Sequence, residues 1–209
     1  MNAKTILGVV AALVVVVAVG LGPRLMHWFG PPAVVGETTT TTTSAVAIGG
    51  AFELVNGDGE TVTEQDFKGK WMLVYFGYTF CPDVCPTSLG TIAAALDGLD
   101  PATVGQITPV FITVDPERDT PDVVGQYVSH FHPAMVGLTG SQEQIDAAVQ
   151  VYRAYSKKAP QEEGPYLMDH SSVTYLMNPE GEFVRHFSHG VSPDDMAEGL
   201  RKALTSAGA

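Results

Sequence analysis

The chain has 209 residues, enough for one globular domain with its own core after an N-terminal segment. It contains two cysteines and carries a formal net charge of -12 at pH 7. Because nucleic acids bind to basic surfaces, a chain this acidic is not expected to bind them. The charge is compatible with a basic protein partner, although an acidic surface most often serves solubility.

Residues 1–29 are predicted to form a transmembrane anchor. Thr5–Gly22 has no charged side chain and consists mostly of Val, Ala, Leu and Ile. As a helix this segment spans about 27 Å, close to the hydrocarbon thickness of a bilayer. Lys4 favours a cytoplasmic N-terminus, although Arg24 on the far side weakens that orientation. The alternative is a cleaved signal peptide, but the apolar run is long for one and no convincing Ala-x-Ala site closes it.

Residues 30–47 are predicted to be a linker, and residues 48–209 a single soluble domain. The linker contains Pro31-Pro32 and the threonine run Thr38–Thr43, and it is too polar to bury a core. We expect it to hold the domain away from the membrane. The segments together indicate a single-pass protein of the bacterial inner membrane, with its domain in the periplasm.

Turn and capping signals divide the domain into strands and helices. Asn56-Gly57-Asp58-Gly59 indicates a hairpin turn, and Thr120-Pro121 and Ser141 are typical of helix starts. In chain order we expect strands 51–55 and 60–63, a helical turn 64–67, strand 71–76, helix 86–99, strand 107–114, helix 121–131, strand 135–138, helix 141–152, loop 159–169, a hairpin of strands 172–177 and 183–187, and a final helix from 192. This order predicts an α/β thioredoxin-like sandwich with an N-terminal β-hairpin.

The two cysteines, Cys81 and Cys85, stand where the first buried strand meets a helix. Trp71–Phe76 is an apolar run that ends at Gly77, and Pro86 suits the first turn of a helix. The positive end of the helix dipole favours a thiolate, which is both a nucleophile and a metal ligand. Their spacing places both sulfurs on one face of a helix. A structural disulfide is disfavoured because so short a loop constrains the unfolded chain little, which leaves redox chemistry or metal binding.

Three stretches of the domain form a recognisable set. They are YFGYTFCPDVCP (Tyr75–Pro86), VDPERDTP (Val114–Pro121) and DHSS (Asp169–Ser172). In this order, and over residues 48–204, they closely resemble the SCO/SenC family of membrane-anchored copper chaperones, which help to assemble the binuclear copper centre of cytochrome c oxidase. The resemblance implies Cys81, Cys85 and His170 as copper ligands. It implies the copper-binding subunit of the oxidase and other periplasmic copper chaperones as partners.

The chemistry of these residues agrees with copper binding. Two thiolates and an imidazole suit Cu(I), and with a weak further ligand the same set holds Cu(II). We therefore expect a metallochaperone without turnover. The alternative is a thiol-disulfide oxidoreductase in which Cys81 and Cys85 reduce the cysteines of the oxidase subunit. The Cys-x-x-x-Cys spacing differs from the Cys-x-x-Cys of thioredoxins, and a peroxidase would not need His170.

For the remaining polar residues near the motifs, the sequence leaves two interpretations open. Asp83 either tunes the site or faces water, and Asp169 either orients His170 or caps a turn. The segment Asp115–Pro121 is expected at the same end of the sheet as the cysteines. There it shapes the site or a partner surface, or it is only a tight loop with a helix cap. No role is assigned to His27, at the membrane edge. Four other histidines stand in i,i+2 and i,i+3 pairs that could bind metal, but they are interpreted as surface residues: His130, His132, His186 and His189.

Overall fold

The computed structural model describes residues 47–159, 161 and 163–207. The predicted anchor, its orientation, His27 and nearly all of the predicted linker lie outside these residues. Within the described part of the chain, no helix is both long enough and apolar enough to cross a bilayer.

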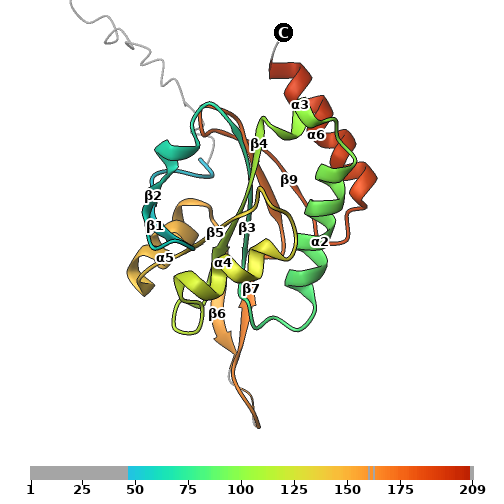
Figure 1. Ribbon diagram of the computed structural model, residues 1–209. Helices are drawn as coiled ribbons and strands as arrows, with labels where there is room; N and C mark the ends of the chain where they lie inside the picture. Colours follow the sequence, from blue (N-terminus) through green and yellow to red (C-terminus); the bar gives the residue numbers. More distant parts are fainter. Residues whose placement is uncertain (1–46, 160, 162, 208–209) are drawn as a thin grey trace, which may run out of the picture. The chain divides into compact units, whose positions relative to one another are not determined.

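A sheet of seven strands forms the centre of the described domain, in the order β2-β1-β5-β4-β3-β8-β9 (Figure 1). β3, β4 and β5 pair in parallel, and the other neighbours pair antiparallel. The strands are β1 (Glu53–Asn56), β2 (Thr61–Thr63), β3 (Trp71–Gly77), β4 (Ile107–Thr113), β5 (Val136–Thr139), β8 (Thr174–Met177) and β9 (Phe183–Phe187). These strands confirm the predicted hairpins at the two ends of the element order and the parallel strands between them.

The helices confirm most of the predicted starts. They are η1 (Glu64–Phe67), α2 (Val84–Asp97), α3 (Pro101–Val104), α4 (Pro121–Ser129), α5 (Gln142–Val151) and α6 (Pro193–Ala207). At α5, the Ser141 hydroxyl accepts from the backbone N–H of Gln144, whose side chain accepts from the N–H of Ser141, so a capping box fixes the start. The short α3 was not predicted. α2 begins two residues before the predicted Pro86, so Cys85 lies in its first turn.

The two faces of the sheet are packed by different helices. Alternate residues of β3 point to opposite faces. The ring of Phe76 lies 5.4 Å from that of Tyr152, which directly follows α5. Tyr75 and Gly77 point the other way, toward the sulfur of Cys85 on α2. α2 and α6 pack side by side (Figure 1). The buried strand β3 therefore ends directly against the helix that carries Cys85.

The predicted loop 159–169 is longer than the loop in the structure, because strands of a second, two-stranded sheet occupy both of its ends. β6 (Ser156–Ala159) pairs antiparallel with β7 (Leu167–His170), and Ser156 stands opposite His170. In Figure 1 this hairpin extends beyond the end of the main sheet. Its strands read SKKA and LMDH, which lack the apolar alternation that predicts a strand. The result matters for the site, since His170 is the last residue of strand β7.

Candidate metal centre

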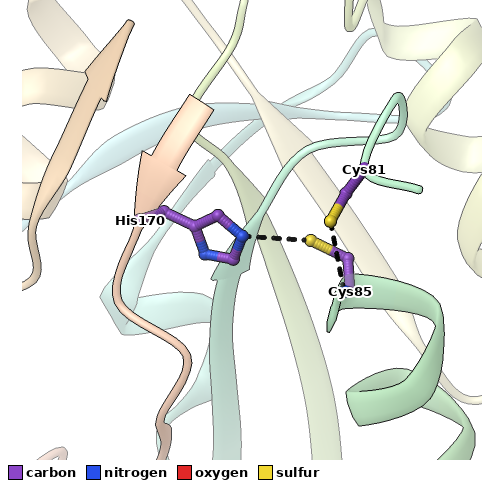
Figure 2. Close-up of side chains that lie close together, drawn as sticks. All are labelled: Cys81, Cys85 and His170. Atoms are coloured by element: carbon purple, nitrogen blue, oxygen red, sulfur yellow. Dashed lines mark hydrogen bonds between the residues drawn. The ribbon is translucent and has the colours of Figure 1, made fainter. Parts of the chain in front are cut away.

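Cys81, Cys85 and His170 meet at the carboxyl end of β3 (Figure 2). Cys81 lies on the loop before α2, Cys85 in the first turn of α2, and His170 at the end of β7. One ligand atom from each residue lies within 4.8 Å of the other two, and Cys85 Sγ is 3.3 Å from His170 Nε2. Both cysteines are free thiols. The three predicted site residues therefore form one group of metal-ligand atoms.

The two thiols differ in their access to solvent. Cys85 is fully buried, and Cys81 is half-buried. Strand β3 approaches the sulfur of Cys85 closely at Gly77. A β-carbon on Gly77 would lie 2.8 Å from the Cys85 sulfur and 3.0 Å from carbons of the Phe111 and Tyr75 rings. A glycine at the end of β3 thus leaves room for the inner sulfur, while Cys81 closes the site on its outer side.

A backbone carbonyl orients the imidazole of His170. Its Nδ1 lies 3.0 Å from the carbonyl oxygen of Ser171, which can only accept, so Nδ1 carries the proton and Nε2 presents its lone pair to the sulfurs. The rings of Tyr75 and Tyr78 contact the imidazole edge-on, at centroid distances of 6.1 and 5.7 Å. Asp169 is exposed and lines the cavity beside His170, but the described residues show no hydrogen bond between the two side chains. Of the two alternatives for Asp169, the orientation of His170 is therefore not supported, because the Ser171 carbonyl takes that place.

The environment of the cysteines separates their pKa values. A hydrogen bond with the Cys85 thiol, aided by the backbone N–H groups of Asp83 and Cys85, lowers the pKa of Cys81 to about 4 despite partial burial. The Cys85 N–H lies 3.4 Å from Cys81 Sγ. The same contact between the thiols, together with burial, raises the pKa of Cys85. At neutral pH the pair therefore holds one thiolate, on Cys81, and one thiol, on Cys85.

This separation predicts that Cys81 is alkylated at acidic pH. The ordinary thiol pKa is 9.0, so at pH 6 a pKa of about 4 gives roughly a thousandfold more thiolate. The rate rises less than this, because nucleophilicity falls with pKa. We expect iodoacetamide to modify Cys81 at a nearly constant rate from pH 8 down to pH 5, with a fall near pH 4. Mass spectrometry of the labelled peptide measures this profile, and Cys85→Ala, which removes the hydrogen-bond donor, should move its midpoint upward. A midpoint near 9 in the unmodified chain would contradict the assignment.

Asp119 connects the second motif to the cysteine loop. Its carboxylate accepts from the backbone N–H and the hydroxyl of Thr79, at 2.9 and 2.6 Å, and from the hydroxyl of Thr113 at 2.5 Å. Asp119 is fully buried, and this burial raises the pKa of its carboxyl group although the hydrogen bonds oppose the shift. Thr79 stands two residues before Cys81. The interpretation that this motif shapes the site is therefore confirmed at Asp119.

Arg118 links the cysteine loop to the strand that carries His170. It forms an ion pair with the buried Asp115, and its Nη1 donates to the carbonyl oxygen of Tyr166 at 3.0 Å. The guanidinium carbon lies 3.8 Å from the ring centroid of Tyr166 and 4.9 Å from that of Phe80. Phe80 precedes Cys81, and Tyr166 precedes β7. Sequence reasoning did not identify Tyr166, whose role depends on a contact between distant segments.

An open cavity of about 330 Å³ lies in front of the thiol–imidazole group. Its walls include residues that sequence reasoning did not assign to the site, notably Met168 and His189, together with the exposed Asp83. Met168 could have been found from the two-residue period of β7 had that strand been recognised. His189 is exposed, as predicted, yet it borders the site, and the sequence contains no local signal for this.

The other described histidines lie away from the site. His130 ends α4 and contacts the carbonyl oxygen of Gln126 at 2.6 Å. His132 accepts the N–H of Ala134 at 3.1 Å. His186 lines a separate groove between β9 and α6. His130 and His186 are exposed, as predicted for surface residues, whereas the side chain of His132 is only 11% exposed.

The fold and the site together define a thioredoxin-like α/β protein with a Cys-Cys-His group able to bind copper. The chain belongs to the SCO1/SenC family, whose model matches residues 40–205. It is 46% identical over 158 residues to a mitochondrial SCO1 homolog 1 of Arabidopsis thaliana and 40% identical over 155 residues to the mitochondrial SCO1 homolog of Homo sapiens. These alignments cover 76% and 73% of this chain and 47% and 52% of the relatives. The chain thus spans about half the length of these two relatives.

Solved structures of similar proteins agree with the fold. A copper-bound ScoI from Arabidopsis thaliana superimposes with a TM-score of 0.72 at 44% identity, covering 77% of this chain and 99% of that one. A copper-bound ScoI from Bradyrhizobium japonicum gives a TM-score of 0.69 at 43% identity, covering 75% and 99%. The predicted family resemblance and the α/β fold class are thereby confirmed.

Proposed function

We propose that this protein is a membrane-anchored copper chaperone that binds copper through Cys81, Cys85 and His170. The convergence of these three side chains, with ligand atoms within 4.8 Å of one another, carries the proposal. Thiolates are soft ligands that select Cu(I), and imidazole suits copper in both oxidation states. The hydrogen bond from Nδ1 to Ser171 supports the role of His170, because it leaves Nε2 available to a metal.

The asymmetry of the two thiols supports delivery of the metal to a partner. Copper enters and leaves on the side of Cys81 and His170, which are half-buried and line the cavity, while the buried Cys85 holds it from within. A thiolate of the acceptor replaces Cys81 first, so the metal passes through shared coordination. The acceptor we propose is the copper-binding subunit of cytochrome c oxidase, at its binuclear copper centre, and the donors are other periplasmic copper chaperones.

The proposed location of the protein follows from its N-terminal sequence. Residues 1–29 anchor the chain in the bacterial inner membrane, and residues 30–47 hold the domain 48–209 in the periplasm. The apolar run Thr5–Gly22 supports the anchor.

Copper binding by the reduced, full-length chain tests the proposed function. We expect one copper per chain and, with Cu(II), strong thiolate-to-copper charge-transfer absorption. The control is the double variant Cys81→Ser and Cys85→Ser, which should bind no stoichiometric copper. A reduced wild-type chain without stable copper would overturn the copper chaperone.

A thiol-disulfide oxidoreductase remains the second candidate, because the low pKa of Cys81 favours attack on a disulfide. In this reaction the Cys81 thiolate attacks a partner disulfide, and Cys85 then resolves the mixed disulfide. The partner is reduced to two thiols, and Cys81 and Cys85 are oxidised to a disulfide. The two candidates differ at His170, which copper binding requires and disulfide exchange does not. Fast exchange in a chain that binds no copper would favour this candidate.

A further inference from the structure

The loop between β9 and α6 brings a second histidine to the cavity of the candidate metal centre. His189 lines this cavity together with Cys81 and His170. A hydrogen bond from the N–H of Val191 to the carbonyl of Ser188, at 3.2 Å, closes a turn around it. Gly190 has a φ of 82°, which glycine adopts readily. The turn therefore fixes the backbone of His189 at the rim of the site, although the residue lies 104 positions after Cys85 in the sequence.

The imidazole of His189 contacts the helix that carries Cys85. Its Nδ1 lies 3.3 Å from the hydroxyl oxygen of Ser88, a buried residue three positions after Cys85 in α2. His170 makes the corresponding contact from Nδ1 to the Ser171 carbonyl. The hydroxyl of Ser88 can donate or accept, so this contact holds the ring beside α2 and is compatible with both tautomers. In the tautomer with the proton on Nδ1, Nε2 keeps its lone pair and can bind a metal.

The two oxidation states of copper differ in the number of ligands they require. Three soft donors complete the coordination of Cu(I), whereas Cu(II) favours four donors in a tetragonal arrangement. Among the described residues, the metal-ligand group consists of Cys81, Cys85 and His170. A fourth ligand for Cu(II) would therefore come from another part of the cavity wall. We propose that His189 is this ligand and binds Cu(II) through Nε2, an inference that rests on the proposed copper-binding function.

The other donors of the cavity fit this role less well. Asp83 and Asp169 line the same cavity, but both are exposed, and no hydrogen bond with another described residue holds either carboxylate toward the metal. Met168 shares the face of His170, but its thioether is a soft ligand suited to Cu(I). The imidazole of His189 is a suitable ligand for Cu(II). His189 is not one of the three residues whose ligand atoms lie within 4.8 Å of one another, so its exposed ring turns into the cavity to bind the metal.

Pulsed electron paramagnetic resonance on the full-length chain loaded with one equivalent of Cu(II) tests the assignment by counting coordinated imidazoles. We expect two in the wild type and one in His189→Gln. The Cu(II) dissociation constant of His189→Gln should rise by about tenfold or more, while its Cu(I) dissociation constant stays within about twofold. His186→Gln is the matched control, because this exposed histidine lines the separate groove with Trp71 and Lys202. It should keep two imidazoles and the wild-type affinity.

Several results would overturn the assignment. These are a single imidazole in the wild type, an unchanged spectrum in His189→Gln, and an equal loss of Cu(I) and Cu(II) affinity, which would make His189 structural. A change of the Cu(II) spectrum in Met168→Leu but not in His189→Gln would assign the fourth position to the thioether. A wild-type chain that binds no copper in either state would overturn the proposed function itself. A chain that binds copper with one imidazole would overturn only the role of His189.

Discussion

Replacing His170 with alanine is expected to weaken copper binding by more than about a hundredfold, while the disulfide between Cys81 and Cys85 still forms. Changes to residues that only support a metal ligand already cost 10- to 100-fold in affinity, and removal of a ligand should cost more. His170 Nε2 lies 3.3 Å from the buried sulfur of Cys85, so no other described side chain takes its place without movement. Competition with a chelator of known affinity measures the change in Cu(I) dissociation constant.

The control for this variant separates loss of a ligand from loss of fold. His130→Ala removes an exposed histidine at the end of α4 that contacts a carbonyl of its own helix. We expect wild-type copper affinity for it. Thiol titration after mild oxidation should show complete disulfide formation in both variants, because the Cys81 and Cys85 sulfurs meet without the imidazole. Unchanged copper affinity in His170→Ala would exclude the three-ligand site.

The sequence was sufficient to predict the cysteine side of the site. The apolar run Trp71–Phe76, Gly77 and Pro86 together indicate a buried strand that passes into a helix, and the structure places β3 and α2 there. Such signals are local, because a strand buried on both faces and a helix start depend on residues adjacent in the chain. Position 170 was assigned from the family motif alone, since no local pattern identifies one histidine as a ligand.

The contacts across the site could not be predicted, because they join segments that are distant in sequence. The strands of the β6–β7 hairpin are short and lack an apolar alternation. Only their pairing in the folded chain identifies them as strands. The carbonyl of Ser171 orients His170, a role that the sequence analysis gave to Asp169 as one of two alternatives. His189 reaches the cavity through the turn before α6. In each case the deciding fact is a distance between backbone segments, which only the folded chain provides.

Replacing Asp119 with alanine is expected to lower the free energy of unfolding by about 2–4 kcal/mol, because it leaves buried donors without an acceptor. The carboxylate accepts three hydrogen bonds from Thr79 and Thr113. Chemical denaturation measures the change. Asp122→Ala is the control, since this aspartate is exposed in the first turn of α4, and its loss should cost less than about 1 kcal/mol. Equal stability of the two variants would contradict the role of Asp119.

The conservative variant Asp119→Asn distinguishes the charge of the side chain from its hydrogen bonds. Burial raises the pKa of Asp119 above its ordinary value of 3.8, so folding favours the protonated carboxyl group. The stability that this shift contributes is fully present below pH 3.8 and is lost as the pH rises through the raised pKa. Asparagine does not titrate in this range and keeps one oxygen acceptor, so the variant should be less destabilised than Asp119→Ala.

The stability of the wild type relative to Asp119→Asn should therefore fall as the pH rises from below 3.8 toward neutrality. Unfolding free energies of both chains, measured at a series of pH values, give this difference directly. A difference that is independent of pH would mean that the carboxyl group titrates equally in the folded and unfolded chains.

Because Thr79 stands two residues before Cys81, we also expect Asp119→Ala to weaken copper binding through a looser cysteine loop. Asp119→Asn should retain more of the wild-type copper affinity, since it keeps an acceptor for the Thr79 backbone N–H.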